Sequence, residues 1–397
     1  MGDVADLVGG GTQNTQYPEY WDGDIDWYAP AEIADQIYVK TSQRKITEQG
    51  YDNSSAKLLP PGTVLFTSRA GIGKTAILAR KGCTNQGFQS IVPHKNELDT
   101  YFIFSRTEEL KRYGELVGAG STFVEVSGKQ MAAMDLMLPS TIREQQTIGA
   151  FFKKIDHLIT LHQRKYDKLT NVKKSMLEKM FPKNGSNVPE IRFKGFSDAW
   201  EQRKFDEVFD CTIPNNTLSR SELNYESGSV RNIHYGDILI KYGSVVDVQN
   251  DEIPFATGKS SDDFKGALLQ DGDIIIADTA EDETTGKACE IGNSQGLDVV
   301  SGLHTMVCRP RNKMALGYLG YYLNSDAYHH QLLPLMQGIK VLSLSRTNVQ
   351  KTMVCYPKSK AEQQLIADCF RNLDNLITLH QRESTYFTGG FYAEQHK

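Results

Sequence analysis

One stretch of this sequence occurs twice, and the repeat limits the folds that are open to the chain. Residues 144–164 read EQQTIGAFFKKIDHLITLHQR, and residues 362–382 read EQQLIADCFRNLDNLITLHQR. The copies lie 218 positions apart and agree at 13 of 21 places, including an unbroken LITLHQR. The repeat predicts two related halves that each end in the same element.

Both copies are predicted to form helices with a narrow apolar stripe. The stripe residues follow one another at alternating steps of four and three, which places them on one side of a helix, as in a coiled-coil seam. A lone stripe of this kind usually packs against its own domain, whereas two copies in one chain favour pairing of the two helices. The predicted pairing residues are Ile148, Phe152, Ile155, Ile159 and His162 in the first copy and Ile366, Phe370, Leu373, Ile377 and His380 in the second.

Each predicted helix also begins with a capping signature, Thr141-x-x-Glu144 in the first copy and Ser359-x-x-Glu362 in the second. In such a capping box, the hydroxyl and the carboxylate both satisfy backbone amides of the first turn. Proline and glycine shortly after residue 181 end the first helix.

The duplication extends beyond the helices, although the segments between them match poorly. At the 218-residue offset Gly120 pairs with Gly338, Ser127 with Ser345 and Pro139 with Pro357. At slightly different offsets, Gly62-Thr-Val-Leu-Phe resembles Gly272-Asp-Ile-Ile-Ile and Asp3-Val4 resembles Glu207-Val208. Short extended runs between Gly- and Pro-bearing turns predict an α+β fold in both halves. Strands are predicted at 63–67, 77–79, 237–241, 273–277 and 305–309, and a helix at 101–115.

The predicted fold is α+β, with two domains that are each followed by a long repeat helix and are related by pseudo-twofold symmetry. Matched helices with divergent domains indicate a common scaffold that carries two different recognition surfaces. The predicted segments are a first domain over 1–140, a first repeat helix over 141–183, a linker over 184–199, a second domain over 200–357, a second repeat helix over 358–388 and a tail over 389–397.

Composition bounds the class of protein. No apolar run approaches the ~18 residues of a membrane helix, and no signal-peptide pattern is present, which predicts a cytoplasmic protein without a membrane partner. The six cysteines include no C-x-x-C pair, as expected for reduced thiols. The net charge of −5 gives no global sign of nucleic acid, but residues 153–183 hold nine Lys or Arg against three acidic residues. Such a stretch is either a solvated helix face or a phosphate contact.

The sequence offers no convincing catalytic or metal site. The segment from Ser68 to Thr75 resembles a phosphate loop, but the G-x-x-x-x-G-K-[ST] pattern requires glycine where Ser68 stands. The histidines show no H-x-x-x-H or H-E-x-x-H spacing, so no metal ligand is predicted. His162 and His380 are predicted to pack across the pseudo-twofold axis. We therefore expect no catalytic residue and no cofactor bound by this chain.

The remaining candidate function is recognition of another molecule by side chains in or beside turns. Arg, Lys, Asn and Gln contact base edges in the major groove, and Ser, Thr and Lys suit phosphates. Each position alone is more simply a surface residue, and only their occurrence in both domains favours DNA binding. The candidates are Trp21, Trp27, Tyr28, Ser68, Arg69, Lys74, Thr75, Asn85, Gln86 and Gln89 in the first domain and Lys241, Tyr242, Lys259, Thr279, His304, Lys340, Ser343 and Arg346 in the second.

Over nearly its whole length, the chain resembles the specificity subunits of type I restriction–modification systems. The resemblance rests on the repeated EQQ…LITLHQR, on the stretches 177–181 (LEKMF) and 188–196 (VPEIRFKGF) with the following 200–204 (WEQRK), and on 62–73 (GTVLFTSRAGIG). It implies a non-catalytic subunit with two target-recognition domains, which are separated by two long antiparallel helices. Each domain reads one half of a split sequence in double-stranded DNA. It implies two modification subunits that methylate adenine with S-adenosylmethionine, and restriction subunits that use ATP and Mg²⁺ for translocation and cleavage.

Two departures from the family pattern leave alternatives open. The family segment found here at 188–204 has no counterpart before Met1, and the second copy loses the pattern after Arg382. These departures predict a chain that is truncated at both ends, a variant allele or the product of a rearranged gene. The alternative functions are a silent cassette acting only as a coiled-coil scaffold and, from the glycine-rich segment alone, a stand-alone NTPase or nuclease.

Overall fold

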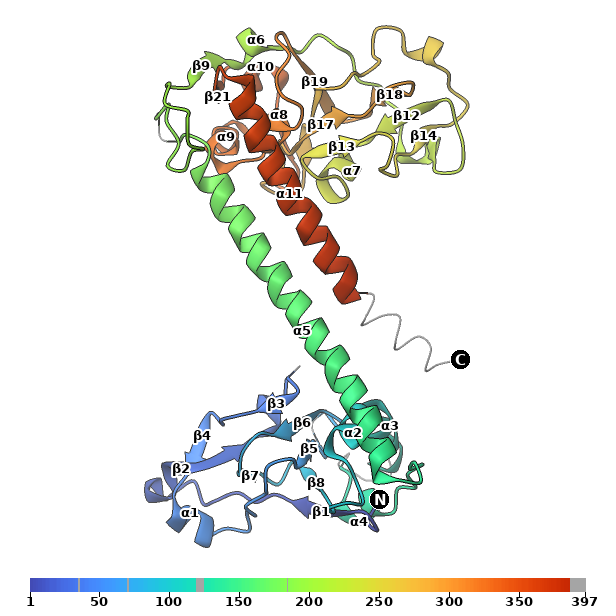
Figure 1. The fold of residues 1–397 in the computed structure, drawn as a ribbon. Helices are drawn as coiled ribbons and strands as arrows, with labels where there is room; N and C mark the ends of the chain where they lie inside the picture. Colours follow the sequence, from blue (N-terminus) through green and yellow to red (C-terminus); the bar gives the residue numbers. More distant parts are fainter. Residues whose placement is uncertain (35, 70, 119–124, 184, 386–397) are drawn as a thin grey trace. The chain divides into compact units, whose positions relative to one another are not determined.

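The computed structural model describes residues 1–34, 36–69, 71–118, 125–183 and 185–385. Ala70 of the glycine-rich segment, Gly120, residue 184 of the predicted linker and the predicted residues 386–397 lie outside this description. The chain forms two compact units, Met1–Leu161 and His162–Lys397, and the long helix α5 (Ile142–Lys179) contributes to both. Each unit carries a sheet-rich head, and α11 (Lys360–Thr385) follows the head of the second unit (Figure 1). The predicted α+β fold is confirmed.

A five-stranded sheet forms the centre of the first head. Its strands are antiparallel except for the edge pair β3–β6, which is parallel. The spatial order is β1 (Ala5–Gly9), β8 (Gln89–Pro93), β5 (Val64–Phe66), β6 (Thr75–Leu78) and β3 (Tyr38–Val39).

The second head contains a five-stranded sheet with the same arrangement. Again only the edge pair, here β13–β17, is parallel. The spatial order is β10 (Phe209–Asp210), β19 (Thr305–Pro310), β15 (Ile274–Ala277), β17 (Ala288–Gly292) and β13 (Val245–Asp247). Strand by strand, the two sheets are therefore copies of one another, as the duplication predicts.

The match at Gly62 and Gly272 has a structural cause. Both glycines have positive φ, 86° and 91°, and each precedes the central strand of its sheet. A side chain at such a position would be strained, so glycine is the residue that fits. Ser127 and Ser345, which the repeat also pairs, are both N-caps whose hydroxyls accept the amide three residues on. The repeat therefore marks turns and caps that both heads require.

Smaller sheets complete each head. The first head adds β4 (Arg44–Ile46), β2 (Trp21–Tyr28) and β7 (Cys83–Thr84). The second adds a four-stranded sheet of β11 (Leu223–Asn224), β14 (Phe255–Ala256), β12 (Val230–Ile233) and β18 (Asp298–Ser301), and the pairs β16 (Thr279–Ala280) with β20 (Leu342–Ser343) and β9 (Glu201–Lys204) with β21 (Met353–Tyr356).

Short helices flank the sheets. They are α1 (Glu48–Asp52), α2 (Thr100–Ser105), α3 (Thr107–Gly118) and α4 (Gly128–Ala132) in the first head and α6 (Phe205–Val208), α7 (Tyr235–Ile240), α8 (Tyr318–Leu323), α9 (Asp326–His329) and α10 (Arg346–Val349) in the second. The predicted helix over 101–115 is divided at Arg106 into α2 and α3.

The predicted strand over 237–241 is wrong, because this segment belongs to helix α7. In a strand, Ile238 and Ile240 would point to the same face. Instead Ile238 and Tyr242, four residues apart, are both buried, whereas Ile240 is 90% exposed. His234 caps the helix, since its Nδ1 accepts the Gly236 amide at 3.1 Å. The run of apolar residues suggests a strand, but the spacing of the buried residues is that of a helix.

The described part of the predicted linker is packed within the second unit. No helix or strand is present over the described residues 185–199, yet the Trp200 amide donates to the Asn187 carbonyl at 2.8 Å and the Trp200 side chain is buried. Trp200 shares its core with Met180 and Phe181, which follow α5. The residues that follow α5 are thus fixed in the core of the second unit.

Candidate nucleic-acid interface

The glycine-rich segment between Thr67 and Lys74 forms the turn between β5 and β6. The Thr67 hydroxyl donates to the Gly71 carbonyl at 2.7 Å and accepts from the Lys74 amide at 2.9 Å. Gly71 and Gly73 have φ of 103° and 96°, which glycine adopts without strain. A phosphate loop joins a strand to a helix, whereas this loop leads into an antiparallel strand. The geometry is that of a hairpin tip, on which the Lys74 side chain is exposed.

A second loop of the first head meets this hairpin. The Ser68 amide donates to the Gly87 carbonyl at 2.8 Å, and a side-chain carbon on Gly87 would lie 3.5 Å from Nε of Arg69. Asn85 holds its own turn, because its Oδ1 accepts the Gly87 amide at 2.8 Å. Gln86 beside it is exposed. The structure therefore brings Arg69 together with the loop that leads into β8, where Gln89 is the first residue.

The second head brings its candidates together at the equivalent place. Thr279 follows β15 as Arg69 follows β5, and it pairs with Ser343. Arg69 pairs in the same antiparallel manner with Glu125, which stands 218 positions before Ser343. The Asp278 amide donates to the His304 carbonyl at 3.1 Å, and His304 leads into β19 as Asn85 and Gln86 lead into β8. Each head thus brings some of its candidates together at corresponding loops of its five-stranded sheet.

The remaining exposed candidates of the second head fall into two groups. Lys340 and Arg346 flank Ser343 in the chain and are exposed. Lys241 instead pairs with Glu252 at 2.6 Å and lies over the Tyr225 ring, and Lys259 lies 4.0 Å from Asp263. The structure gives these two lysines acidic partners within the head.

Burial removes several candidates from the surface. The Trp21 and Trp27 rings pack edge to face, 5.2 Å apart, within one apolar cluster. Tyr242 is buried in the core of the second head, which raises its pKa above the usual range of tyrosine. These side chains complete cores and so are not available to DNA in this conformation. The buried candidates are Trp21, Trp27, Tyr28, Ser68, Thr75 and Tyr242.

The repeated EQQ motif docks each long helix on its own head. In α5 the buried Gln145 accepts from the Asp99 amide and donates to the Glu97 carbonyl, both at 3.1 Å. In α11 the equivalent Gln363 accepts from the Ala315 amide at 2.9 Å and donates to the Pro357 carbonyl at 2.8 Å. The repeated glutamine therefore accepts an amide just before α2 in the first head and just before α8 in the second, while its donated hydrogen bonds go to different segments.

A tyrosine–aspartate bond reinforces each joint. The Tyr101 hydroxyl donates to Asp156 at 2.7 Å in the first unit, and the Tyr321 hydroxyl donates to Asp374 at 2.9 Å in the second. Burial raises the pKa of Asp156, while the bond from Tyr101 opposes this rise. The sequence analysis missed these residues, although the two aspartates stand at the 218-residue offset and could have been found there.

The residues of the predicted pairing stripe pack in different places along the two helices. Ile148 and Phe152 pack against the core of the first head, as a lone stripe would, because the first turns of α5 lie on that head. Ile366 and Phe370 are buried in the core of the second unit together with Met180 and Phe181. The remaining stripe residues Ile155, Ile159, Leu373 and Ile377 are half-buried.

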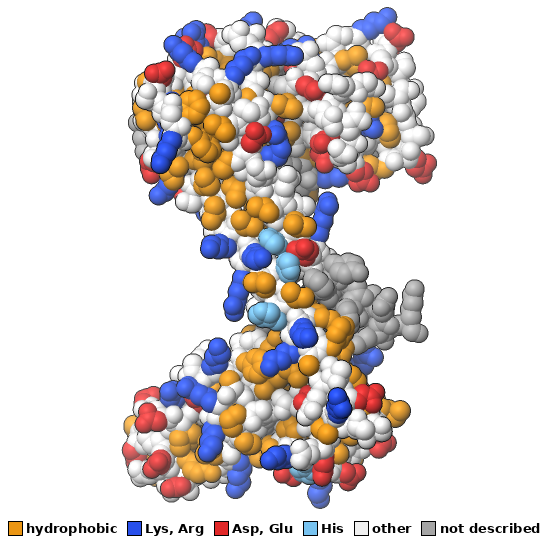
Figure 2. All heavy atoms as spheres, viewed as in Figure 1, with side chains coloured by type: hydrophobic (Ala, Val, Ile, Leu, Met, Phe, Trp, Pro, Cys, Tyr) orange, Lys and Arg blue, Asp and Glu red, His pale blue; other side chains and the backbone are white. Residues whose placement is uncertain are grey.

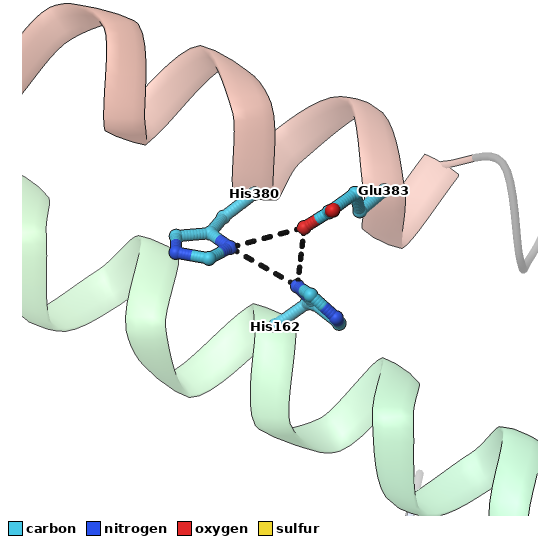
Figure 3. A group of neighbouring side chains, drawn as sticks. All are labelled: His162, His380 and Glu383. Atoms are coloured by element: carbon cyan, nitrogen blue, oxygen red, sulfur yellow. Dashed lines mark hydrogen bonds and ion pairs between the residues drawn. The ribbon is translucent and has the colours of Figure 1, made fainter.

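Within the second unit, the last turns of α5 run antiparallel to α11. Phe181 stacks on Phe370 at 5.8 Å, Lys173 pairs with Asp374 at 2.5 Å, and His162 faces His380 with 3.0 Å between their Nδ1 atoms. Residues later in α5 lie beside residues earlier in α11, so the two helices are antiparallel. The antiparallel arrangement and the facing histidines agree with the sequence prediction (Figure 3).

The capping prediction holds only in part. The Thr141 and Ser359 hydroxyls accept the amides of Glu144 and Glu362 at 3.2 and 3.4 Å. The buried Glu362 carboxylate, however, accepts from Arg192 Nε at 2.7 Å and Nη2 at 2.9 Å and from Trp200 Nε1 at 3.3 Å. A buried carboxylate requires a cation, and the segment before the second head supplies it.

Charge and hydropathy add little to these contacts. Figure 2 shows Lys and Arg side chains scattered over the visible face of each unit, with acidic side chains among them. In the described part of the chain, no helix has both the length and the apolar content that crossing a membrane requires.

Comparison with known proteins gives one consistent result. The family model for the type I restriction modification DNA specificity domain matches residues 1–171 and 197–385. The chain is 30% identical over 279 residues to the type I restriction enzyme MjaIX specificity subunit of Methanocaldococcus jannaschii, covering 69% of this chain and 59% of that protein. It is 27% identical over 186 residues to the EcoR124I/EcoR124II specificity subunit of Escherichia coli, covering 42% and 45%. The chain spans about half the length of these relatives.

A solved structure shares the fold. The type I restriction-modification system S subunit from M. genitalium superposes with a TM-score of 0.53 at 13% identity, covering 98% of this chain and 91% of that one. At this identity the likeness concerns the fold alone.

Proposed function

The chain belongs to the family of type I restriction-modification DNA specificity subunits, and from this membership we propose that it reads a split DNA target with one half-site per head. The observation that carries the proposal is the correspondence of the two heads. Their five-stranded sheets have the same strand order, and several exposed or half-buried candidates of each head lie at corresponding loops. A duplicated head presents equivalent surfaces to two separated stretches of one duplex.

We assign base and phosphate contacts to the exposed or half-buried side chains of these loops. Arg69 and the amides beside it have the chemistry for base edges, and Lys74 has the chemistry for a phosphate. In the second head, Lys340 and Arg346 supply the positive charge on either side of Ser343. The proposed contacts are Arg69, Lys74, Asn85, Gln86 and Gln89 in the first head and Thr279, His304, Lys340, Ser343 and Arg346 in the second.

The proposed partners follow from the family. Two modification subunits would supply adenine methylation with S-adenosylmethionine, and restriction subunits would supply ATP- and Mg²⁺-dependent translocation and cleavage. The exposed faces of α5 and α11 are their proposed docking surfaces, and the helices are proposed to set the gap between the half-sites. The recognition domains are proposed to cover 1–140 and 200–357, and the chain is proposed to act in the cytoplasm.

Selection from a random duplex library tests the proposal. The purified chain, alone and with its modification subunits, is used to capture duplexes, and the captured pool is sequenced. We expect two different short motifs at a fixed separation, with affinity that falls steeply as salt rises. A captured pool without any shared motif would instead support a scaffold that does not read DNA.

A further inference from the structure

Two histidines and one glutamate, residue types that can bind metal ions, converge where α5 and α11 meet in the second unit (Figure 3). His162 comes from α5, and His380 and Glu383 come from the last turns of α11. Nδ1 of His162 lies 3.0 Å from Nδ1 of His380 and 2.7 Å from Oε2 of Glu383, which in turn lies 3.2 Å from Nδ1 of His380. Three donor atoms of three residues thus form one small triangle.

Hydrogen bonds among these three groups cannot satisfy all three contacts. A carboxylate oxygen only accepts, and each Nδ1 carries at most one hydrogen in the plane of its ring. If both histidines donate to Glu383, two N–H groups face each other across 3.0 Å without an acceptor between them. If only one donates, one Nδ1 lone pair is left facing the carboxylate oxygen. A cation at the centre would instead accept a lone pair from each atom.

The donor set suits a particular class of cation. Two imidazole nitrogens and one carboxylate oxygen bind Zn²⁺ and similar divalent transition metals, with bonds of about 2.0–2.2 Å. Ligand atoms around a tetrahedral ion of that size lie roughly 3.3 Å apart, slightly wider than the triangle. Mg²⁺ and Ca²⁺ prefer oxygen ligands and suit this set poorly. The three side chains are 14%, 13% and 37% exposed, so the group is in contact with solvent, which can supply a water as fourth ligand.

We propose that this triangle binds a divalent transition-metal ion, with Zn²⁺ as the representative, and that the ion joins α11 to α5. The repeat supplies the two histidines at equivalent positions. The residue at the offset of Glu383 in the first copy is Lys165, so the carboxylate comes from one helix only. His380 and Glu383, three residues apart, lie on one face of α11. The ion fixes which turn of α11 lies beside His162, a role that goes beyond the reading of DNA.

The test uses the full chain, stripped of metal and titrated with Zn²⁺ by calorimetry, and with Co²⁺ followed by its visible absorption. His162→Gln, His380→Gln and Glu383→Gln remove one ligand each and keep a polar side chain of similar size. His330→Ala is the matched control, because His330 is an exposed histidine of the same unit. Thermal unfolding of each metal-free variant establishes that it is folded before titration.

We expect one equivalent of Zn²⁺ in the wild-type chain and in His330→Ala, and a higher unfolding midpoint with the metal bound. Removal of a residue that hydrogen-bonds to a metal ligand typically lowers metal affinity by roughly 10–100-fold, and each ligand variant should lose more Zn²⁺ affinity than this. The unfolding midpoint of each ligand variant should no longer change when Zn²⁺ is added. Equal Zn²⁺ affinity of the wild type and His380→Gln would overturn the proposal, as would the absence of stoichiometric binding. Neither result depends on DNA binding, so failure here leaves the proposed function untouched.

Discussion

At the scale of single residues, Lys74 separates the two interpretations of the glycine-rich loop. It lies exposed on a hairpin tip between antiparallel strands, where a cation can approach a phosphate of the DNA backbone. Lys74→Ala is expected to weaken duplex binding to all sequences alike and to lower the salt slope of log K by roughly 1. Lys74→Arg, which keeps the charge, is the control. The fluorescence anisotropy of a labelled duplex, measured over a range of salt concentrations, gives the affinity and the salt slope of each variant. ATP hydrolysis that disappears with Lys74→Ala would contradict the assignment.

Glu290 is a second informative residue, because it occupies a core strand position at which the first head has Ile77. Burial raises its pKa from 4.5 to about 7, and amide hydrogen bonds from Gly317 and Gly320 oppose the rise. Between these pH values the folded chain binds the proton more tightly than the unfolded chain does. Folding stability therefore falls as pH rises through this window, by about 1.4 kcal/mol per pH unit.

Glu290→Gln keeps the shape and an acceptor oxygen while it removes the ionisation. We expect the variant to match the wild type near pH 4 and to exceed its free energy of unfolding by about 3 kcal/mol at pH 8. Urea unfolding at both pH values measures the difference, with the exposed Glu283→Gln as control. A difference that does not change between the two pH values would show that Glu290 is not the source.

At the scale of elements, α11 is anchored by its first turns. Phe370 is fully buried against Phe181, whereas Leu373 one turn on is only half-buried. Phe370→Ala is expected to cost about 3–5 kcal/mol and Leu373→Ala about 2 kcal/mol of the free energy of unfolding. Leu379→Ala, at a position 48% exposed, should stay within about 0.5 kcal/mol. Chemical denaturation of the three variants ranks them, and equal costs would refute the anchoring role of Phe370.

The elements also show what sequence reasoning could reach. The long helices and the strands after Gly62 and Gly272 follow from periodicity and turn chemistry, which are local. The antiparallel course of the helices follows only from the family resemblance. The helix around Ile238 could not be read from its apolar run, because distant core residues decide which side chains are buried. The Glu362 carboxylate likewise has the spacing of a capping box, yet a cation 170 residues away binds it.

At the scale of the whole molecule, the repeat separates a common frame from variable surfaces. The frame consists of the sheet order, the glutamine joint and the tyrosine–aspartate bond, which recur in both units. The loops at the corresponding sheet ends differ in sequence, with Arg69 and Lys74 in one head and Thr279 and His304 in the other. Because the frames match and the loops do not, we expect the two half-sites to differ and to be read independently.

The most direct measurement is the methylated DNA motif after an exchange of heads. Residues 205–357 are replaced by the second head of another family member, and the chain is produced in cells with its modification subunit. Sequencing that detects methylated adenine should show one half-site replaced, with the other half-site and the gap retained, because α5 is unchanged. If the exchange rewrites both half-sites, or if the parent chain directs methylation to a single continuous palindrome, the two-headed account is wrong.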